Sequence, residues 1–408
     1  MQKFIPASGQ VVGAREKELM HKAVDRGWLT AGAFNADFEV GLSDYLDSKK
    51  NIHVLTTNSG SSANLLALSA LTSPSLGARA LKPGDEVITV ACGFPTTINP
   101  ILQNGCVPVF VDVNSTLNID TLMLEAAITP KTRAIMVAHT LGNPFNLQDI
   151  CALADRHNLW LIEDCCDALG ATWNGQKVGT FGHLATLSFF PAHHITMGEG
   201  GAVIINDSTL TRLVQSFRDW GRDCWCAPGD DNTCGKRFDW KLGELPCGYD
   251  HKYIFSHAGY NLKITEMQAA CGVAQLEQAD TFVAARRRNF AYLKEGLKQH
   301  AHTLMSPKVY PEAEPSWFGY PIWLRNADFD RDTFVRYLNQ NNIGTRLLFA
   351  GNVTKQPYMQ GREYRVVGDL SNSDEVMNNL LWIGVQPALT KEMLDYVIEK
   401  IDLFMGNF

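Results

Sequence analysis

Short apolar runs that alternate with helical patterns are the feature that most constrains how this chain folds. Each run is four to seven residues long and ends in polar or glycine-rich residues. Helical patterns lie between several of them, at Thr121–Ala127 and Leu147–Arg156. Strands that are buried on both faces and joined by helices form mostly parallel sheets. We therefore predict an α/β fold with strands at Val87–Val90, Val107–Val113, Ala134–Ala138, Leu159–Ile162, Ala185–Phe190 and Ala202–Ile205.

The pattern changes after residue 206. A stretch rich in Gly, Asp, Trp and Cys runs from Trp220 to about Tyr260, and a helical pattern then begins at Thr265. This pattern continues through the basic run 286–288, which we interpret as a solvated helix face because no aromatic platform for nucleic acid flanks it. The remaining C-terminal residues alternate shorter strand and helix patterns and predict a smaller α+β domain.

Composition excludes several classes of protein. The 408 residues carry 36 Lys and Arg against 43 Asp and Glu, a net charge of −7, and 45% are hydrophobic. A net negative charge does not attract nucleic acid or anionic lipid, which are themselves negatively charged. No apolar run reaches the ~18–20 residues of a membrane span, and the N-terminus lacks a signal-peptide core. We predict a soluble cytoplasmic protein that binds neither nucleic acid nor membranes.

A Gly/Ser turn that opens a helix is the first candidate binding element. Gly60, Ser61 and Ser62 precede the helix-forming run 65–68. Unpaired amides at a helix N-terminus can bind a phosphate, although Ser and Asn also cap helices that bind nothing.

Two further candidate elements follow strands. The strand at Leu159–Ile162 ends in Glu163 and Asp164, at the sheet edge where α/β proteins bind ligands. An aspartate there can keep a pyridinium nitrogen protonated, or it can serve as a helix cap or ion pair. The next predicted strand, Ala185–Phe190, contains Ser188, and the loop after it carries His193 before a Gly-Glu-Gly-Gly turn.

The order of these elements resembles fold-type I pyridoxal-phosphate enzymes, and specifically the sugar aminotransferase (DegT/DnrJ/EryC1) family, which acts on nucleotide-linked ketosugars. The resemblance covers nearly the whole chain. It is carried, in order, by Trp28-Leu29-Thr30, Gly60-Ser61-Ser62-Ala63, Phe110-Val111-Asp112-Val113, Glu163-Asp164, Gly198-Glu199-Gly200-Gly201 and Gly259-Tyr260-Asn261. It implies a mostly parallel seven-stranded sheet between helices. It also implies an N-terminal arm (1–20), a large cofactor-binding domain (21–282) with a cysteine-rich insert (220–260), and a small C-terminal domain (283–408).

The chain departs from the family at the residue that normally holds the cofactor. His193 stands where family aminotransferases carry the Schiff-base lysine, and Asp167 stands where they carry a histidine. Phe190 occupies the position where the family has an aromatic residue or a histidine. These changes resemble the lysine-less branch, the sugar 3-dehydrases, which remove a C3 hydroxyl. The resemblance implies pyridoxamine 5′-phosphate (PMP) held noncovalently, with His193 as the general base. An inactive homologue in which His193 only fills space is the alternative.

The resemblance also assigns further contacts. Ser188 joins the phosphate turn, and Asn261 reaches the phosphate of a neighbouring subunit, which implies a homodimer. Phe94 stands where the family places an aromatic ring against the pyridine ring of the cofactor. The alternative is that Phe94 only packs within its loop. Phe318 and Arg346 are weaker candidates for the sugar nucleotide, the arginine as a phosphate partner.

Four cysteines form the pattern Cys166-x57-Cys224-x-Cys226-x7-Cys234. Four thiolates commonly hold an iron–sulfur cluster, and the single-residue gap suits zinc less well; packed thiols are a third possibility. The same spacing in the iron–sulfur branch of the sugar 3-dehydrases implies a [2Fe–2S] cluster, a CDP-linked 4-keto-6-deoxyhexose substrate, and a separate NADH-dependent iron–sulfur flavoprotein reductase.

The expected function is therefore PMP-dependent C3 deoxygenation in 3,6-dideoxyhexose biosynthesis. Three alternatives remain at this point: a pyridoxal-phosphate (PLP) sugar aminotransferase, a cluster-free dehydrase that takes its amine from glutamate, and a noncatalytic scaffold on the same fold.

Overall fold

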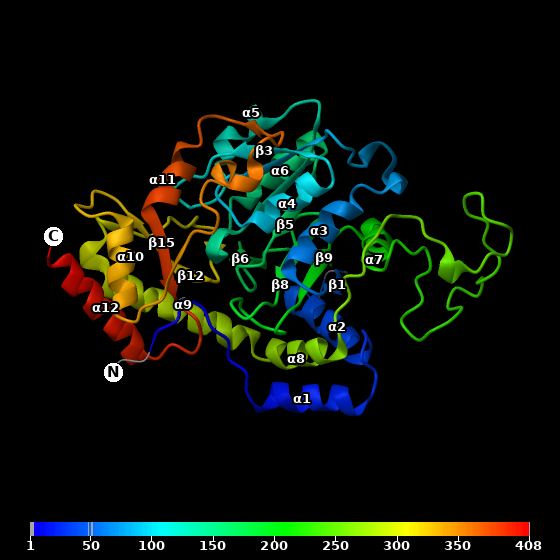
Figure 1. The fold of residues 1–408 in the computed structure, drawn as a ribbon, viewed down its shortest axis with the longest axis horizontal. Coiled ribbons are helices and arrows are strands. Elements are labelled where there is room, and N and C mark those ends of the chain that lie inside the picture. Colours follow the sequence, from blue (N-terminus) through cyan, green and yellow to red (C-terminus); the bar gives the residue numbers. More distant parts are fainter. Residues whose placement is uncertain (1–3, 48, 50–51, 408) are drawn as a thin grey trace.

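The computed structural model describes residues 4–47, 49 and 52–407 (Figure 1). Its centre is an eight-stranded sheet in the order β1-β9-β8-β5-β4-β2-β3-β14. The pairs from β8 through β14 are parallel, whereas β9 pairs antiparallel with both β1 and β8. The strands are β1 (His53–Thr57), β2 (Glu86–Val90), β3 (Val107–Val111), β4 (Thr132–Ala138), β5 (Trp160–Asp164), β8 (Leu184–Ser188), β9 (Gly201–Ile205) and β14 (Arg365–Val366).

The sequence predicts this sheet well. All six expected strands form, and the mainly parallel α/β class is confirmed. Eight strands rather than seven are present because β14, only two residues long, adds to β3 from the C-terminal part of the chain. Helices flank the sheet: α1 (Ala14–Asp25), α2 (Ala33–Asp47), α3 (Gly60–Ala70), α4 (Pro95–Gln103), α5 (Leu124–Ala127), α6 (Leu147–His157), α7 (Thr211–Arg218) and α8 (Glu266–Leu276).

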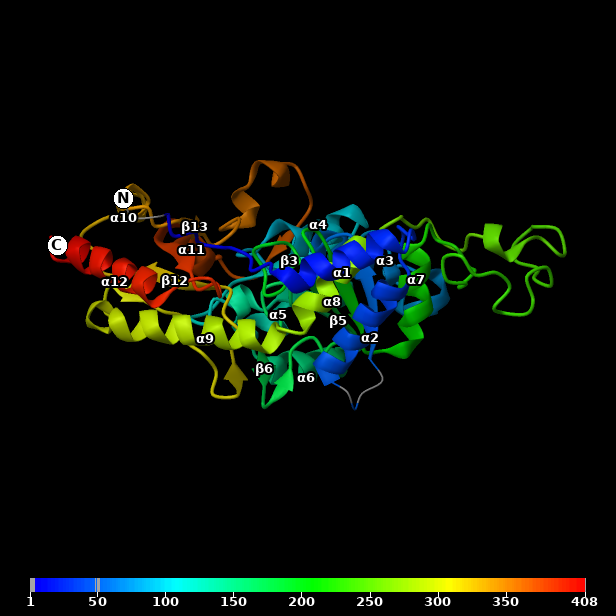
Figure 2. The ribbon, with the colours of Figure 1, turned by 90° about the horizontal axis from the view of Figure 1, so that it is seen from below.

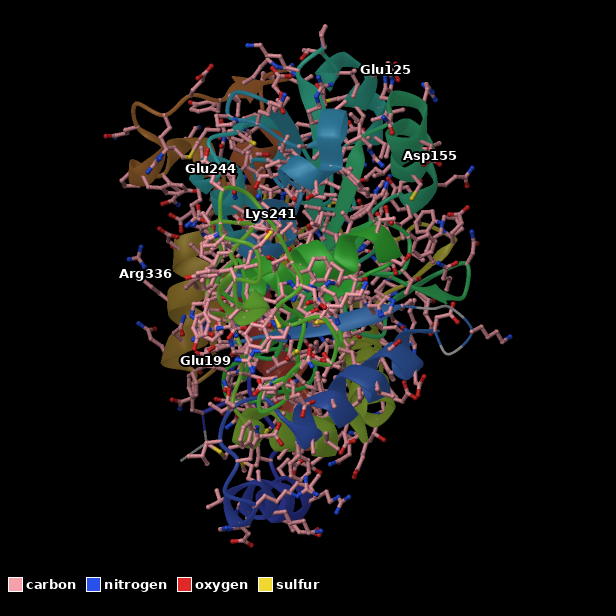
Figure 3. All side chains as sticks on the ribbon, turned by 90° about the vertical axis from the view of Figure 1, so that its right-hand side faces the viewer. Glu125, Asp155, Glu199, Lys241, Glu244 and Arg336 are labelled. Carbon is pink, nitrogen blue, oxygen red and sulfur yellow. The ribbon has the colours of Figure 1, made fainter. Side chains whose placement is uncertain are left out.

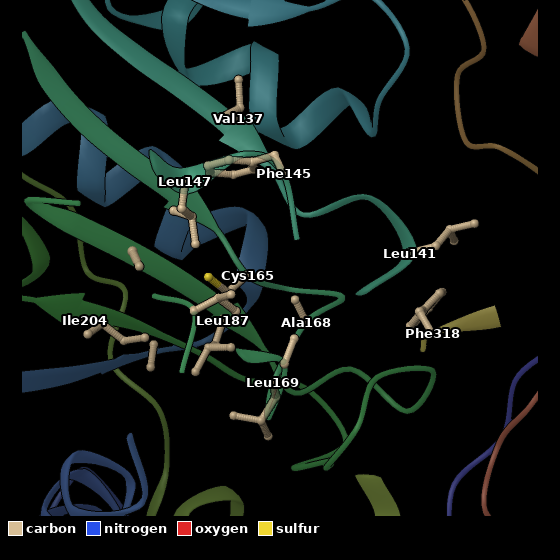
Figure 4. Packing of buried hydrophobic residues seen from close by; sticks show 14 of the residues in the cluster. Val137, Leu141, Phe145, Leu147, Cys165, Ala168, Leu169, Leu187, Ile204 and Phe318 are labelled. Carbon is tan, nitrogen blue, oxygen red and sulfur yellow. The ribbon is translucent and has the colours of Figure 1, made fainter. Parts of the chain in front are cut away.

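Alternate residues of the central strands serve two separate cores. In β5, Leu161 packs in one cluster with side chains of α2, α6 and α8, whereas Trp160 and Ile162 pack in another with side chains of α3, α4 and α7. Figure 4 shows the first cluster near the end of β5, where Cys165 and Leu169 lie among buried side chains. The sheet is therefore covered on both faces, and Asp164 and Ser188 stand at the carboxyl ends of their strands.

A second, antiparallel sheet forms the smaller part, in the order β10-β12-β15-β13. Its strands are β10 (Leu304–Met305), β12 (Gly319–Leu324), β13 (Thr345–Leu347) and β15 (Leu380–Gly384). The accompanying helices are α9 (Ala279–Gly296), α10 (Arg331–Gln340), α11 (Ser371–Asn379) and α12 (Lys391–Met405). Three short strands, β6 (Thr172–Trp173), β7 (Gln176–Lys177) and β11 (Ala313–Glu314), make a further small sheet. The division into domains stays a prediction; α9 runs through residue 282.

Two expectations for the region after residue 265 are wrong. The single long helix is two helices, α8 and α9, separated at Glu277 and Gln278. Arg286 is not on a solvated face: it is 1% exposed and is among the largest fully buried side chains. Only Arg288 of the basic run is exposed. The alternation of polar and apolar residues did not reveal this burial, because the acceptors that bind Arg286 lie on distant loops.

The segment that we call the cysteine loop, residues 220–260, projects from the body beyond α7 in both ribbon views (Figures 1 and 2). Its regular structure is one short 3₁₀ turn at His251–Tyr253 and isolated bridges at its base. Figure 3 looks onto this projecting side, with Lys241 and Glu244 of the loop toward the viewer. Within the described residues, no helix combines the length and apolar character that crossing a bilayer requires.

Candidate active site

Several elements end or begin at one edge of the large sheet. Strand β5 ends at Asp164, β8 ends at Ser188, and α3 begins at Gly60. Because β5 and β8 are parallel neighbours, their carboxyl ends meet. The structure thus brings the predicted phosphate turn and the predicted ring-binding aspartate to the same edge, as expected for an α/β ligand site.

Asp164 is buried and accepts three hydrogen bonds. Asn64 Nδ2 donates to Oδ2 at 2.8 Å, and Thr97 Oγ1 donates to the same oxygen at 2.6 Å. The amide of Cys166 donates to Oδ1 at 3.1 Å. A carboxylate has about four acceptor positions. The three donors fix the orientation of Asp164 and leave acceptor capacity for the N–H of a bound ring.

The N-terminus of α3 is partly capped by its own sequence. Ser59 Oγ accepts the amide of Ser62 at 3.0 Å, so the amide of Ser62 is already used, contrary to our expectation that it binds phosphate. The amides of Gly60 and Ser61 have no such partner within the described residues. A Cβ at Gly60 would lie 2.4 Å from Ser188 Cβ. Only glycine permits this close approach, which places the Ser188 hydroxyl beside the free amides.

His193 lies on the loop that follows β8, between a carboxylate and an aromatic ring. Its Nδ1 is 3.4 Å from Asp167 Oδ1, and its ring centroid is 5.2 Å from that of Phe318. Burial raises the pKa of Asp167, while the contact with His193 acts in the opposite direction. Phe190, on the same loop, is exposed. The sequence predictions for His193, Asp167 and Phe318 therefore converge in one place.

Arg286 lies beneath this loop and joins it to the start of β12. Its guanidinium donates to four carbonyl oxygens, those of Ala192, His193, Trp317 and Phe318, at 2.9–3.4 Å. Burial lowers its pKa to about 10, and Asp167 opposes this. Arg286 thus joins the backbone of His193 to that of its aromatic neighbour Phe318.

The remaining predicted residues are more peripheral. Phe94 is exposed at the start of α4, and its ring lies edge-on to Phe349 at 5.6 Å. Arg346 is exposed on β13 and is in register with Trp382, whose ring contacts Phe318. Asn261 is exposed, and its Oδ1 accepts from Lys263 at 2.8 Å.

A buried network behind the site was missed by the sequence reasoning. Glu163 is inaccessible to solvent and accepts the amides of Gly179, Phe181 and Gly182 at 2.7–2.9 Å. His139 Nε2 lies 3.1 Å from the same carboxylate. With Cys165, these two residues are the group of metal-ligand type found within 4.8 Å in the described part of the chain. Since amides occupy both Glu163 oxygens, we interpret the group as a structural network.

The four predicted cluster thiols do not come together within this chain. Cys166 lies two residues after Asp164, whereas Cys224, Cys226 and Cys234 lie on the projecting loop. Among the described residues, no three of the four have sulfur atoms within 4.8 Å of one another. As it stands in one chain, the set therefore does not fit a shared cluster.

Two of the loop thiols already interact. Burial raises the pKa of Cys224. Burial acts the same way on Cys226, but Thr233, whose hydroxyl is 3.1 Å from Sγ, together with Cys224 and Lys252, outweighs it and lowers the pKa. At Cys166, burial and the charges of Asp164 and Asp167 raise the pKa well above its usual range. The loop thus favours a thiolate at Cys226, and the active site disfavours one at Cys166.

The sequence contains partial signals for the site residues that were not predicted. Asn64 stands in the Gly/Ser turn itself, and Thr97 lies three residues after Phe94, so both belonged to recognised segments. Glu163 also stood in a recognised segment, the strand end Glu163-Asp164, but its partners gave no signal in the sequence. The burial of Arg286 gave no signal either, because its partners are backbone groups of other loops.

Comparison with known proteins agrees with this architecture. Residues 10–402 match the model of the DegT/DnrJ/EryC1/StrS aminotransferase family. Lipopolysaccharide biosynthesis protein RfbH of Salmonella typhimurium is 60% identical, over 99% of this chain and 92% of that protein. The dTDP-4-dehydro-2,6-dideoxy-D-glucose 3-dehydratase of Saccharopolyspora spinosa is 51% identical, over 99% of this chain and 87% of that protein.

Solved structures resemble the whole chain as well. E. coli GDP-4-keto-6-deoxy-D-mannose-3-dehydratase with bound hydrated PLP superposes with a TM-score of 0.86 at 28% identity, covering 98% of this chain and all of that one. The expected fold-type I PLP-dependent transferase fold is thereby confirmed. Since the family model spans almost all of the sequence, the chain belongs to the DegT/DnrJ/EryC1/StrS aminotransferase family.

Proposed function

We propose that this protein is a PMP-dependent sugar-nucleotide 3-dehydratase of deoxysugar and lipopolysaccharide biosynthesis. Its proposed substrate is a CDP-linked 4-keto-6-deoxyhexose, and its product leads to 3,6-dideoxyhexoses. The names of two relatives, a lipopolysaccharide biosynthesis protein and a sugar 3-dehydratase, support this class of reaction. The choice of CDP rests on the resemblance of the cysteine pattern, since the named 3-dehydratase acts on a dTDP sugar.

One observation carries the proposal: the side chain that faces Asp167, on the loop after Ser188, is an imidazole. His193 lies 3.4 Å from Asp167 and next to Phe318, on the loop that follows Ser188. An imidazole cannot form a Schiff base with an aldehyde, but it can remove and return protons near neutral pH. This supports dehydration on a noncovalently bound amine cofactor rather than transamination through a lysine.

The chain's own residues fit PMP. Asp164 has acceptor capacity for the ring N–H, and the free amides of Gly60 and Ser61, with the hydroxyl of Ser188, would hold the phosphate. Phe94 would lie against the ring, and Asn261 of a neighbouring subunit would complete the phosphate site in a homodimer. When bound, the cofactor supplies an amine that condenses with the sugar ketone and a ring that accepts electron density.

Asp167 and His193 would handle the protons. Asp167 lies on the Nδ1 side of the imidazole, at 3.4 Å, where a carboxylate would orient a catalytic histidine. His193 would then remove a proton from the cofactor C4′ carbon as the C3 hydroxyl of the sugar leaves. Arg286 keeps the loop in place by binding the His193 carbonyl at 2.9 Å. Phe318 and Arg346 would contact the sugar nucleotide.

Oxygen exchange at the sugar C3 position tests the dehydration step. Protein loaded with PMP should exchange the C3 hydroxyl oxygen of the CDP-linked ketosugar with labelled water, because reversible dehydration consumes no electrons. His193→Asn should lose the exchange while binding PMP, and His157→Asn, on the outer surface of α6, should retain it. Exchange that survives in His193→Asn would refute the assigned base. Substitution of dTDP- and GDP-linked ketosugars in the same assay tests the nucleotide.

A second part of the proposal concerns the source of the electrons that deoxygenation needs after dehydration. We propose that Cys166, Cys224, Cys226 and Cys234 are the ligands that would hold a [2Fe–2S] cluster, which would supply single electrons originating from a separate NADH-dependent iron–sulfur flavoprotein reductase. Support comes from the spacing of the thiols and the thiolate-favouring surroundings of Cys226. Anaerobically purified protein should contain iron and sulfide, which Cys224→Ser should lose and Cys271→Ser should keep. Iron-free protein that still forms the deoxy product would favour the cluster-free dehydrase.

A further inference from the structure

The separation of Cys166 from the other three thiols has a structural cause. Cys166 is fixed at the active site, since its amide donates to Asp164 at 3.1 Å. Cys224, Cys226 and Cys234 lie on the cysteine loop, which stands away from the body beyond α7 in two perpendicular views (Figures 1 and 2). A cluster held by four thiolates therefore needs either a large movement of the loop or a second chain.

The base of the loop is built to hold its direction. Its two stems pair by isolated bridges at Asp219–Asn261 and Arg222–Phe255. The amide of Asp223 donates to the Ile254 carbonyl at 2.9 Å. The stems therefore leave α7 as a paired ribbon, so the loop would reach the body of its own chain only if this ribbon turned as a unit at its base.

The outer part of the loop is also ordered by internal contacts. Arg237 forms two hydrogen bonds with Asp250, at 2.9 and 2.7 Å. His251 is buried and binds Asp223 Oδ2 at 2.7 Å, and its ring stacks on Trp240 at 4.7 Å. The loop thus has its own small packed centre in the projecting position.

Around that centre, the loop exposes more apolar surface than a solvated loop requires. Exposed large side chains on and beside it are Trp220, Trp225, Phe238, Tyr249, Tyr253 and Phe255. At the active-site edge, Phe94 and Phe190 are also about half exposed, at 51% and 47%. Gathered apolar side chains of this kind mark contact surfaces. Two such surfaces on different parts of one chain can cover each other in a symmetric pair of copies.

We propose that the cluster site is shared between two copies of this chain, with Cys224, Cys226 and Cys234 from one copy and Cys166 from the other. The inference rests on the cluster in the proposed function. The shared site agrees with the position of Asn261 at the base of the cysteine loop. The proposed function assigns Asn261 to the phosphate site of a neighbouring subunit. A twofold pair would contain two identical sites, each beside an Asp164. Neither copy would hold a complete set of ligands alone.

Mixed dimers test this directly. Chains with Cys166→Ser and chains with Cys224→Ser, carrying different affinity tags, are co-expressed, and the mixed dimer is isolated through both tags. If the ligands come from two chains, one site of the mixed dimer is intact and the other lacks two ligands. The mixed dimer should then contain half the iron and sulfide of the wild-type dimer, with the same visible absorption per iron. Each variant alone should contain essentially none.

The matched control pairs Cys224→Ser with Cys226→Ser. Both changes lie on the loop, so every site lacks a thiol whether ligands come from one chain or two, and no iron is expected. Gel filtration and PMP binding verify that each sample is folded and dimeric.

The outcomes separate the two proposals. Wild-type protein without iron and sulfide would refute the cluster itself, and the shared site with it. Iron in the wild type but none in the mixed dimer would refute only the shared site and would indicate that the loop folds onto its own chain. Iron retained by Cys166→Ser would also refute it, because a loop donor such as Cys247 would then supply the fourth ligand.

Discussion

Replacing Glu163 with glutamine should destabilise the protein strongly although the two side chains have nearly the same shape. Oε1 of Glu163 accepts the amides of Phe181 and Gly182, and Oε2 accepts the amide of Gly179 and faces His139 Nε2. Glutamine keeps one acceptor oxygen and replaces the other with an NH₂ donor. In either orientation of the amide, that donor faces two groups that require an acceptor.

His139 cannot relieve the conflict by changing its tautomer. Its Nδ1 accepts the amide of Phe145 at 3.3 Å, so moving the proton from Nε2 to Nδ1 transfers the conflict to that contact. Two buried donors are therefore left unpaired, at about 1–3 kcal/mol each. The expected loss is about 2–6 kcal/mol in the free energy of unfolding, measured by urea denaturation at pH 7. Glu125→Gln, at an exposed position, should change it by less than about 0.5 kcal/mol.

The pH dependence gives a second check on the same residue. Burial raises the pKa of Glu163, but His139 and the amides of Gly182 and Gly179 outweigh burial and lower it below its ordinary value of 4.5. A carboxyl whose folded-state pKa is depressed stabilises the fold above its unfolded-state pKa, and loses that contribution as pH falls through the folded-state value. The difference between wild type and Glu163→Gln should therefore be constant near neutral pH and shrink below about pH 4.5. A difference under about 1 kcal/mol at pH 7 would refute the reasoning.

Three further changes probe the active site. Asp164→Asn removes a charge-assisted hydrogen bond worth about 1.5–3 kcal/mol and should weaken PMP binding about 10- to 100-fold, as measured by calorimetry; unchanged affinity would contradict its assignment to the ring. His193→Lys should form a covalent pyridoxyl adduct after PLP and borohydride treatment, detectable by mass spectrometry, whereas an adduct on the wild-type chain would contradict noncovalent cofactor binding. Arg286→Met should lower the free energy of unfolding by about 3–5 kcal/mol in denaturant titrations, because four buried carbonyls lose a charged donor. A decrease under about 1 kcal/mol would show that the fold does not depend on the hydrogen bonds of Arg286.

The sequence predicts the central sheet because each strand is a continuous apolar run, and this run is a direct consequence of burial on both faces. It places Asp164 correctly for the same reason, because Glu163 and Asp164 directly follow such a run and Asp164 stands at the carboxyl edge. Ser188 lies within the predicted run Ala185–Phe190, and in the structure it is the last residue of β8. Strand β14 gave no such signal, since two residues, one of them Arg365, carry no pattern. Its place is set by pairing with β3, far away in the sequence.

Arg286 shows where local patterns mislead. Three consecutive arginines on a helix are typical of a solvated face, and Arg287 and Arg288 are at least partly accessible. Arg286 is buried because carbonyls at residues 192–193 and 317–318 converge on it, which no local window contains. The helix break at Glu277 and Gln278 is similar, because both residues favour helix and the interruption comes from how α8 and α9 pack on different parts of the molecule.

The cysteines show most clearly that a sequence can identify residues of the right chemical type without placing them in space. Spacing along the chain identifies four residues of the right type, and the loop that carries three of them was predicted as an insert at residues 220–260. Spacing cannot say which copy of the chain supplies a ligand. Cys166 is separated from Cys224 by 57 residues, and the sequence is the same in one molecule and in its partner. The projecting ribbon restricts that choice, since it carries the loop thiols away from the Cys166 of their own chain. If a second copy supplies the fourth ligand, cluster assembly depends on dimerisation, and the iron content should fall with any change that separates the two chains.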